Sequence, residues 1–169
     1  QLVEKSMKSG FNQYAPMPGL MQLRERIADK ISNQYQIEYD PESEITITSG
    51  ATQAIFTAIA AFVKEEDEVI IFTPAYDCYQ PAIELVGGKP VFVQMKSPEY
   101  KVNWEEVKKL ISQRTRMIII NTPHNPTGTL LSIEDLKELD KITADSEIII
   151  LSDEVYEHIV FDEIEHASI

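Results

Sequence analysis

Four segments of this sequence place polar and aromatic residues directly after short apolar runs. They read ITSGATQAI (47–55), FTPAYDCYQP (72–81), NTPHNPTG (121–128) and IIILSDEVYEH (148–158). If the apolar runs are strands of a parallel sheet, their carboxyl ends lie at the edge where such sheets bind ligands. We therefore expect the chemistry of this chain to lie in the residues that follow these runs.

The first segment runs through Gly50 into a helix-like stretch. Glycine allows a ligand to approach the backbone closely, and the N–H groups of Ala51, Thr52 and Gln53 would lie at the positive end of the helix dipole. Such a helix start can bind a phosphate group. The alternative is an ordinary capped helix. Neither GxGxxG nor GxxxxGKS/T occurs, which argues against a dinucleotide or ATP site.

The second and third segments offer an aromatic ring and an amide. Tyr76 and Tyr79 follow a strand end and a proline, so one of the rings could stack on a flat cofactor. The alternative for these rings is plain core packing. In NTPHNPTG the prolines restrict the backbone and hold Asn125 at a strand end, where its amide would be a donor with a fixed direction. The alternative for Asn125 is a polar turn.

The fourth segment carries a carboxylate at the end of a strand. An apolar run leads straight into Asp153 and Glu154. Burying such a charge without a cationic partner costs on the order of several kcal/mol. We therefore expect Asp153 to have a permanently positive partner.

The elements that must position these residues alternate along the chain. Strand-like runs, short and mostly β-branched, occur at Ile45–Thr48, Glu68–Phe72, Pro90–Gln94, Met117–Asn121 and Glu147–Leu151. Helix-like stretches lie at Gln53–Lys64, Cys78–Val86, Trp104–Gln113 and Ser132–Asp145, and an earlier amphipathic helix is marked by Leu20, Leu23, Ile27 and Ile31. Apolar strands separated by helices predict an α/β fold, a mostly parallel sheet with helices on both faces.

Length and charge limit the classes of function. The 169 residues, 43% of them apolar, suffice for about one domain. The net charge of −13 opposes binding to nucleic acids and to anionic membranes. No apolar run approaches the ~20 residues of a membrane span.

Cysteine and histidine usage adds two further expectations. A single cysteine, Cys78, excludes a disulfide within the chain, and together with the lack of a signal-peptide pattern it favours the cytoplasm. The histidines, His124, His158 and His166, do not have the spacing of metal ligands, so we expect no metal site.

One cofactor accounts for all four segments. Pyridoxal 5'-phosphate has a phosphate for a helix start, a flat ring for stacking and a phenolic oxygen that accepts hydrogen bonds. Its pyridine nitrogen works best as part of an electron sink when a carboxylate keeps it protonated.

The chain resembles the class I/II aminotransferases of the fold-type I pyridoxal-phosphate enzymes. The resemblance rests on NQYAPMPGLMQLR, TSGATQAI, PAYDCY, NTPHNPTG and SDEVYEH, which occur in the order typical of the family. It covers nearly the whole chain and is greatest to the methionine and kynurenine (glutamine) aminotransferase branch.

The resemblance implies contacts to the phosphate group. It assigns the backbone around Ala51 and Thr52, with Gln53 beside it, to the phosphate. Tyr14 matches a tyrosine that reaches the phosphate of the neighbouring subunit, which implies a homodimer with shared sites.

The resemblance also implies contacts to the cofactor ring. Tyr76 is expected to stack on the ring, and Asn125 and Tyr156 are expected to bond to its hydroxyl oxygen. Asp153 is expected to pair with the pyridinium nitrogen, so that Asp153 and Tyr156 are the catalytic residues of this stretch.

One feature departs from the family pattern. In the family the lysine that bonds to the cofactor follows the SDEVYEH segment, whereas the last lysine here is Lys141. We therefore expect residues 1–169 to be part of the cofactor-binding large domain, with the catalytic lysine, the substrate-binding arginine and the small domain elsewhere in the parent protein.

The activity implied is transfer of an amino group from an amino acid (methionine, glutamine, kynurenine or an aromatic one) to an α-keto acid, by a ping-pong mechanism. One alternative is a C–S β-lyase of the same fold, although such enzymes tend to have His where Tyr156 stands. The other alternative is the aminotransferase-like sensing domain of a transcription regulator.

Overall fold

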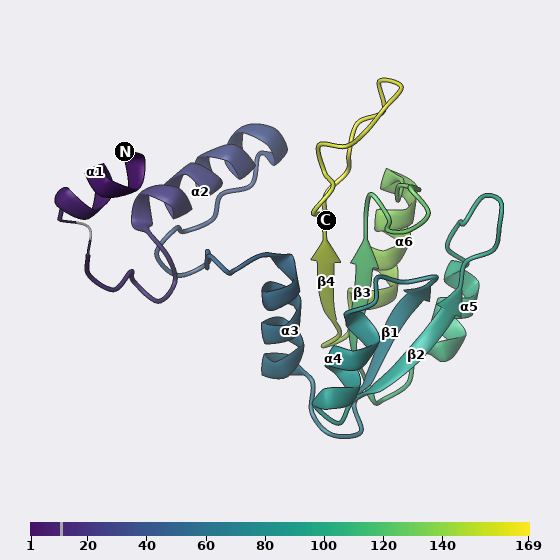
Figure 1. The fold of residues 1–169 in the computed structure, drawn as a ribbon. Helices are drawn as coiled ribbons and strands as arrows, with labels where there is room; N and C mark the ends of the chain where they lie inside the picture. Colours follow the sequence, from purple (N-terminus) through teal and green to yellow (C-terminus); the bar gives the residue numbers. More distant parts are fainter. Residues whose placement is uncertain (11) are drawn as a thin grey trace. The chain divides into compact units, whose positions relative to one another are not determined.

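The computed structural model describes residues 1–10 and 12–169, which fall into two compact units, Gln1–Ser49 and Gly50–Ile169 (Figure 1). Each unit is described by itself below. Among the described residues, no helix is both long enough and apolar enough to cross a membrane.

The first unit contains the helices α1 (Leu2–Lys8) and α2 (Met21–Tyr35). The predicted amphipathic helix is confirmed as α2, whereas α1 was not predicted. Arg24 of α2 is 4% exposed, and its guanidinium donates to the carbonyls of Pro41 at 2.6 Å and Glu42 at 3.1 Å. These bonds tie α2 to the segment that follows it.

The predicted strand at Ile45–Thr48 is wrong, because this segment has no strand structure. The Ile47 N–H donates to the Pro18 carbonyl at 2.9 Å, and a Cβ on Gly19 would lie only 2.4 Å from Ile47 Cγ1. Ile47 therefore packs against a turn and not against a strand. A β-branched run forms a strand only where a second strand supplies a ladder of hydrogen bonds.

The second unit is built around one parallel sheet. In chain order its elements are α3 (Ala51–Phe62), β1 (Glu68–Thr73), α4 (Tyr79–Leu85), β2 (Lys89–Gln94), α5 (Trp104–Leu110), β3 (Thr115–Asn121), α6 (Ile133–Thr143) and β4 (Ile149–Asp153). The described strands are ordered β2-β1-β3-β4, and each neighbouring pair is parallel. The predicted α/β fold is therefore confirmed.

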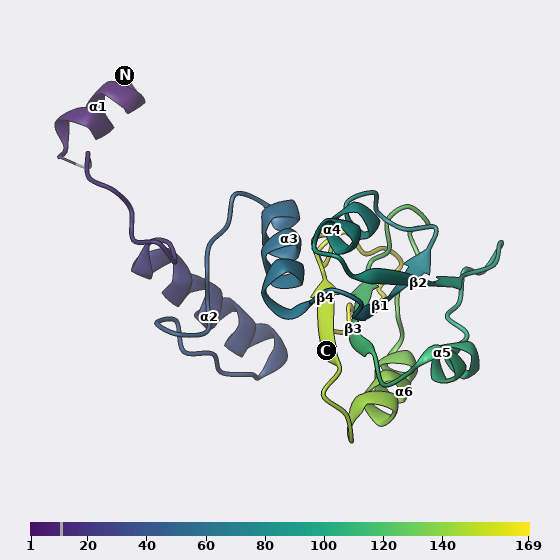
Figure 2. The same ribbon diagram turned by 90° about the horizontal axis from the view of Figure 1, so that it is seen from below.

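Helices cover both faces of this sheet, with α3 and α4 on one face and α5 and α6 on the other (Figure 2). Alternate residues of β1 divide between the faces: Val69 and Ile71 pack against α3 and α4, and Ile70 and Phe72 pack on the other side. Because both faces of the central strands are buried, β1 and β3 have continuous apolar runs, Val69–Phe72 and Met117–Ile120, that do not alternate with polar residues.

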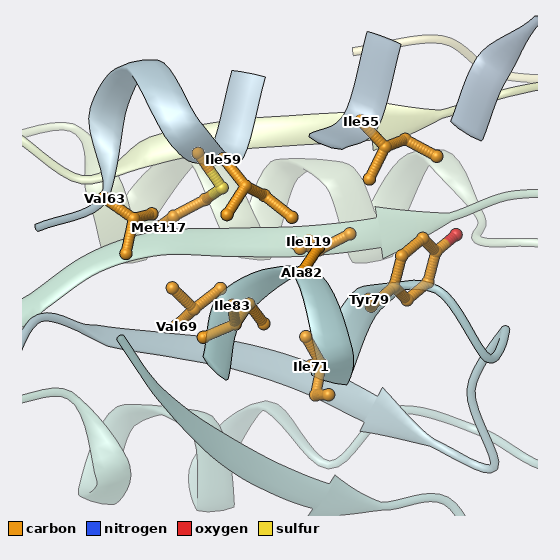
Figure 3. Packing of buried hydrophobic residues seen from close by; sticks show 10 residues of the cluster. All are labelled: Ile55, Ile59, Val63, Val69, Ile71, Tyr79, Ala82, Ile83, Met117 and Ile119. Carbon is orange, nitrogen blue, oxygen red and sulfur yellow. The ribbon is translucent and has the colours of Figure 1, made fainter. Parts of the chain in front are cut away.

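The core between the sheet and α3 and α4 consists of aliphatic side chains and one tyrosine (Figure 3). Tyr79, at the start of α4, lies beside Ile119 at the carboxyl end of β3, where its hydroxyl is the single polar group shown in the cluster. The parallel register also pairs Asn121 with Asp153, the last residues of β3 and β4. Three polar side chains are thereby brought to one edge of the sheet.

The doubly covered sheet predicts a large difference between two matched substitutions in the full-length protein. Ile70 is fully buried, whereas Ile133 is 56% exposed on α6. Ile70→Ala should lower the free energy of unfolding by about 2 to 5 kcal/mol, because it leaves a cavity in the core. Ile133→Ala should change it by about 0.5 kcal/mol or less. Urea denaturation measures both, and equal effects would contradict the burial described here.

Candidate functional site

The candidate site is a hollow of about 200 Å³ at the carboxyl edge of the sheet. Its lining includes most of the residues expected from the sequence, contributed by α3, by the segment before α4 and by the ends of β3 and β4: Ala51, Thr52, Ile55, Tyr76, Asn121, Asn125, Asp153, Val155 and Tyr156. All of these residues belong to the second unit. The fold therefore brings together segments that are up to about a hundred residues apart in the sequence, as parallel sheets do.

Asp153 is buried, with 9% of its surface exposed, and its two carboxylate oxygens have different donors. The Tyr79 hydroxyl donates to Oδ2 at 2.5 Å, and the Val155 N–H donates to Oδ1 at 3.3 Å. Among the described residues no Lys, Arg or His side chain pairs with this carboxylate. The described chain therefore gives Asp153 neutral donors but not the cation that its burial calls for.

Glu68, at the amino end of β1, shows the contrasting arrangement of a buried carboxylate. It accepts from the Ser112 hydroxyl at 2.6 Å and from Nε and Nη2 of Arg114 at 3.0 and 2.8 Å. The Ser112 hydroxyl, together with Arg114, lowers the pKa of Glu68 below its ordinary value, against the effect of burial. The charge of Glu68 is thus balanced within the chain, whereas that of Asp153 is not.

Asn121 joins the end of β4 to the loop that carries Asn125. Its Nδ2 donates to the Asp153 carbonyl at 2.8 Å, and its Oδ1 accepts from the Asn125 N–H at 2.7 Å. Sequence reasoning passed over Asn121 because it was read as the last residue of a strand. An amide that ends an otherwise apolar strand was the available signal.

The NTPHNPTG loop is held by its own hydrogen bonds. His124 Nδ1 lies 2.8 Å from Thr127 Oγ1, the His124 N–H donates to the Thr129 carbonyl at 2.8 Å, and the Gly128 N–H donates to the His124 carbonyl at 2.7 Å. Burial lowers the pKa of His124, which favours a neutral imidazole at neutral pH. These bonds connect residues on both sides of Asn125 within the loop.

The start of α3 has Gly50 at its N-cap, with φ of 89° and without a side-chain capping bond. A Cβ built on Gly50 would meet no described atom within 4 Å, so the backbone here is open on that side. Glycine is itself a common N-cap residue, so this geometry suits either alternative given by the sequence, a phosphate-binding helix start or an ordinary capped helix. A left-handed glycine leading into a helix leaves the first turn accessible to an anion.

Tyr76 stands beside this helix start, its hydroxyl 3.5 Å from Thr52 Oγ1. The Tyr76 ring contacts the Tyr79 ring edge to face, with centroids 5.8 Å apart. The two tyrosines thus have different environments, Tyr76 half-buried at the hollow and Tyr79 buried beneath it. Tyr79 belongs to the core cluster and Tyr76 packs against it, so core packing, the alternative noted for both rings, describes each of them in part.

The remaining predicted residues are more exposed. Tyr156 lines the hollow after β4 with 36% of its surface exposed, and Gln53 lies exposed in the first turn of α3. Tyr14 belongs to the first unit, where its side chain is fully exposed.

Two larger hollows lie near the same edge. One, of about 460 Å³, shares Asn125 and Tyr156 with the candidate site and so adjoins it. The other, of about 370 Å³, includes Asp135, whose carboxylate accepts from Trp104 Nε1 at 2.8 Å and from the N–H of Ser132, the N-cap of α6. Both oxygens of that carboxylate are already used in hydrogen bonds within the fold. The larger volume of this hollow therefore does not make it the better candidate for the functional site.

The chain matches the family described as Aminotransferase class I and II over residues 1–169. It is 48% identical over 160 residues to the methionine aminotransferase of Escherichia coli K12, which covers 95% of this chain and 42% of that protein. It is 42% identical over 170 residues to an aspartate aminotransferase of Pyrococcus abyssi, which covers 100% of this chain and 44% of that protein.

Solved structures give the same result. The structure of an Escherichia coli protein reported to have a methionine aminotransferase function superposes with a TM-score of 0.95 at 46% identity, over 98% of this chain and 44% of that one. An aromatic aminotransferase from Pyrococcus horikoshii superposes with a TM-score of 0.91 at 43% identity, over 98% and 44% respectively.

The chain therefore belongs to the class I and II aminotransferase family, and its sheet and helices are those of the fold-type I enzymes. It spans less than half the length of the relatives that it matches.

The position of Asn121 predicts a structural penalty when its amide is removed. In the full-length protein, Asn121→Ala should lower the free energy of unfolding by about 1 to 3 kcal/mol, because it strips the partner from a buried carbonyl and an N–H. Asn33→Ala is the control, since its exposed amide donates only to the Asp29 carbonyl, and it should cost about 0.5 kcal/mol or less. Denaturant unfolding compares them, and a penalty for Asn121→Ala no larger than the control's would refute the bridging role.

Proposed function

We propose that the parent protein of this chain is a pyridoxal-phosphate-dependent aminotransferase that moves an amino group from an amino acid to an α-keto acid. The observation that carries the proposal is the buried carboxylate of Asp153, which has neutral donors but no cation among the described residues. A protonated pyridine nitrogen would supply that cation. Membership of the aminotransferase family supports the same reading.

The donor set of the hollow fits the phosphate end of this cofactor. The glycine-led start of α3 offers backbone N–H groups at Ala51 and Thr52, and Gln53 follows in the same turn. An anion is favoured there by the helix dipole as well as by hydrogen bonds. We propose that these residues bind the phosphate.

The ring end of the cofactor fits the other side of the hollow. We propose that Tyr76 stacks on the ring and that Asn125 and Tyr156 donate hydrogen bonds to its phenolic oxygen. All three line the same hollow as Asp153, and the Asn125 backbone is fixed by Asn121. Hydrogen bonds to that oxygen favour its ionised form.

When bound, the cofactor supplies an electron sink for the charge that develops at the substrate α-carbon. In this proposal Asp153 holds a proton on the ring nitrogen, so that the sink carries a positive charge when it is needed. Residues 1–169 contain no lysine after Lys141, and the base that moves the α-proton is proposed to lie elsewhere in the parent protein. Residues 1–169 are proposed to form part of the cofactor-binding large domain.

The proposed amino donor is methionine, glutamine, kynurenine or an aromatic amino acid. Methionine is supported by the 48% identity to a methionine aminotransferase. We also propose that the enzyme is cytoplasmic. Cys78 fits this location as an unreactive free thiol, because burial, together with the charge of Asp153, raises its pKa to about 11.

The role of Asp153 predicts a large loss of turnover. In the full-length enzyme, Asp153→Ala should lower kcat by about 100-fold to 10,000-fold, since it removes the group that keeps the sink protonated. Steady-state assay with methionine and an α-keto acid measures this effect. The control is Asp145→Ala, at an exposed position, which should leave kcat within about twofold. Near-parental turnover of Asp153→Ala would exclude the assignment.

We further propose that the enzyme is a homodimer in which the exposed Tyr14 serves the phosphate site of the neighbouring subunit. This predicts complementation between Tyr14→Phe and Asp153→Ala subunits. Their heterodimer would combine one doubly altered site with one intact site and should have about half of the parental activity, so a fully exchanged equimolar mixture should gain about a quarter of the parental activity from its heterodimers. Mixing with confirmed subunit exchange tests this. If exchange occurs and activity stays at the mean of the two variants, Tyr14 acts within its own subunit or not at all.

A further inference from the structure

Tyr79 is placed to control the carboxylate on which the proposed function depends. It is 3% exposed, belongs to the first turn of α4, and donates to Asp153 Oδ2 at 2.5 Å across 74 residues of sequence. A hydrogen bond from a neutral donor to a carboxylate favours the charged form of the carboxylate. The phenol is therefore more than a packing group.

The donor in this pair is the phenol over the whole ordinary pH range. Burial raises the pKa of Tyr79 far above its ordinary value, and the hydrogen bond to Asp153 raises it further. The phenol therefore keeps its proton, and Asp153 Oδ2 keeps its donor.

The bond also fixes the orientation of the carboxylate. Asp153 Oδ2 faces Tyr79, and Oδ1 faces the Val155 N–H at 3.3 Å, so the two oxygens are held from different directions. The Tyr79 ring is itself held between the aliphatic core and the edge of Tyr76. Asp153 is thus bound to a rigid part of the core and also lines the hollow.

Other ionisable groups surround this pair. From the segment leading into α4 come Tyr76 and Cys78, and the thiol stays protonated because its pKa is raised to about 11. From the segment after β4 come Glu154 and Tyr156.

The carboxylate of Glu154 accepts from the hydroxyls of Ser152 and Ser168 at 2.6 and 3.0 Å, and His166 Nε2 lies 3.7 Å from it. From α3 and the end of β3, the residues that line the hollow are Ala51, Thr52, Ile55 and Asn121, none of which titrates.

We propose that Tyr79 is a positioning residue that donates to the Asp153 carboxylate and keeps it correctly oriented toward the ring nitrogen of the cofactor. This inference rests on the proposed function. Tyr79 touches neither the substrate nor the cofactor in this proposal, and it acts only through Asp153. Without the phenol, Oδ2 would lose the donor that supports its negative charge, and the carboxylate would pair less well with a cationic ring.

The test uses the full-length enzyme, freed of cofactor, and pyridoxamine 5'-phosphate as the probe, since this compound has the ring nitrogen but forms no bond to a lysine. Binding is measured against pH by equilibrium dialysis. In Tyr79→Phe, the pH below which binding is lost should rise by about one unit or more, the size expected for a hydrogen bond to a charged group. The 1-deaza analogue, in which carbon replaces the ring nitrogen, should show no such shift.

The matched control is Tyr100→Phe, which alters a half-buried tyrosine at the 370 Å³ hollow on the other face of the sheet and should leave the profile unchanged. Turnover gives a second measurement. In Tyr79→Phe, kcat should fall about 10-fold with KM for the amino acid unchanged. The acid limb of the pH profile of kcat should move to higher pH.

The outcomes separate the two proposals. If Asp153→Ala binds the probe with the parental affinity and pH profile, the proposed function of Asp153 fails. If Asp153→Ala loses the pH-dependent binding while Tyr79→Phe keeps the parental profile, the inference on Tyr79 alone is overturned. Equal shifts for the probe and the 1-deaza analogue would show that Tyr79 only supports packing, which also overturns it.

Discussion

The candidate site of the second unit centres on one buried carboxylate that the described chain leaves without a cation. Asp153 ends β4 at the carboxyl edge of the sheet, where Tyr79 and the Val155 N–H hold its oxygens. Glu68, at the amino end of β1, is equally buried but has Arg114 beside it. One edge of the sheet is thus electrostatically complete within the chain. At the other edge, Asp153 has neutral donors and no Lys, Arg or His partner among the described residues.

The helices on both faces pack the sheet that forms this edge. α3 and α4 bury one face and α5 and α6 the other, and β3 and β4 keep one register from Met117 and Ile149 to Asn121 and Asp153. That register places Asn121 beside Asp153, and Asn121 in turn holds the Asn125 backbone. The site is therefore anchored mainly by backbone and core contacts, which limits the freedom of the groups that would meet a cofactor.

Much of this arrangement could be predicted from local patterns. Strands buried on both faces are recognisable as continuous apolar runs, and the order of helices and strands follows from their alternation. The prediction of a strand at Ile45–Thr48 was wrong because a β-branched run does not indicate whether a second strand is available to pair with it. Here the Ile47 N–H donates to the Pro18 carbonyl instead. Asn121 was missed for a related reason, since its role depends on what β4 places next to it.

The sequence by itself determined the parallel α/β fold and the four segments that supply the hollow, and it placed Asp153 where burying its charge has a cost. These follow from periodicity, glycine and proline placement, and the cost of burying charge, which are all local. Only the tertiary structure decided which of the two tyrosines faces the hollow and which lies beneath it. Tyr79 and Asp153 are 74 residues apart, and their contact exists because α4 packs on the face of the sheet that α3 also covers, with Tyr79 at its start near the carboxyl edge. Such a pairing depends on how elements pack, and no local pattern encodes it.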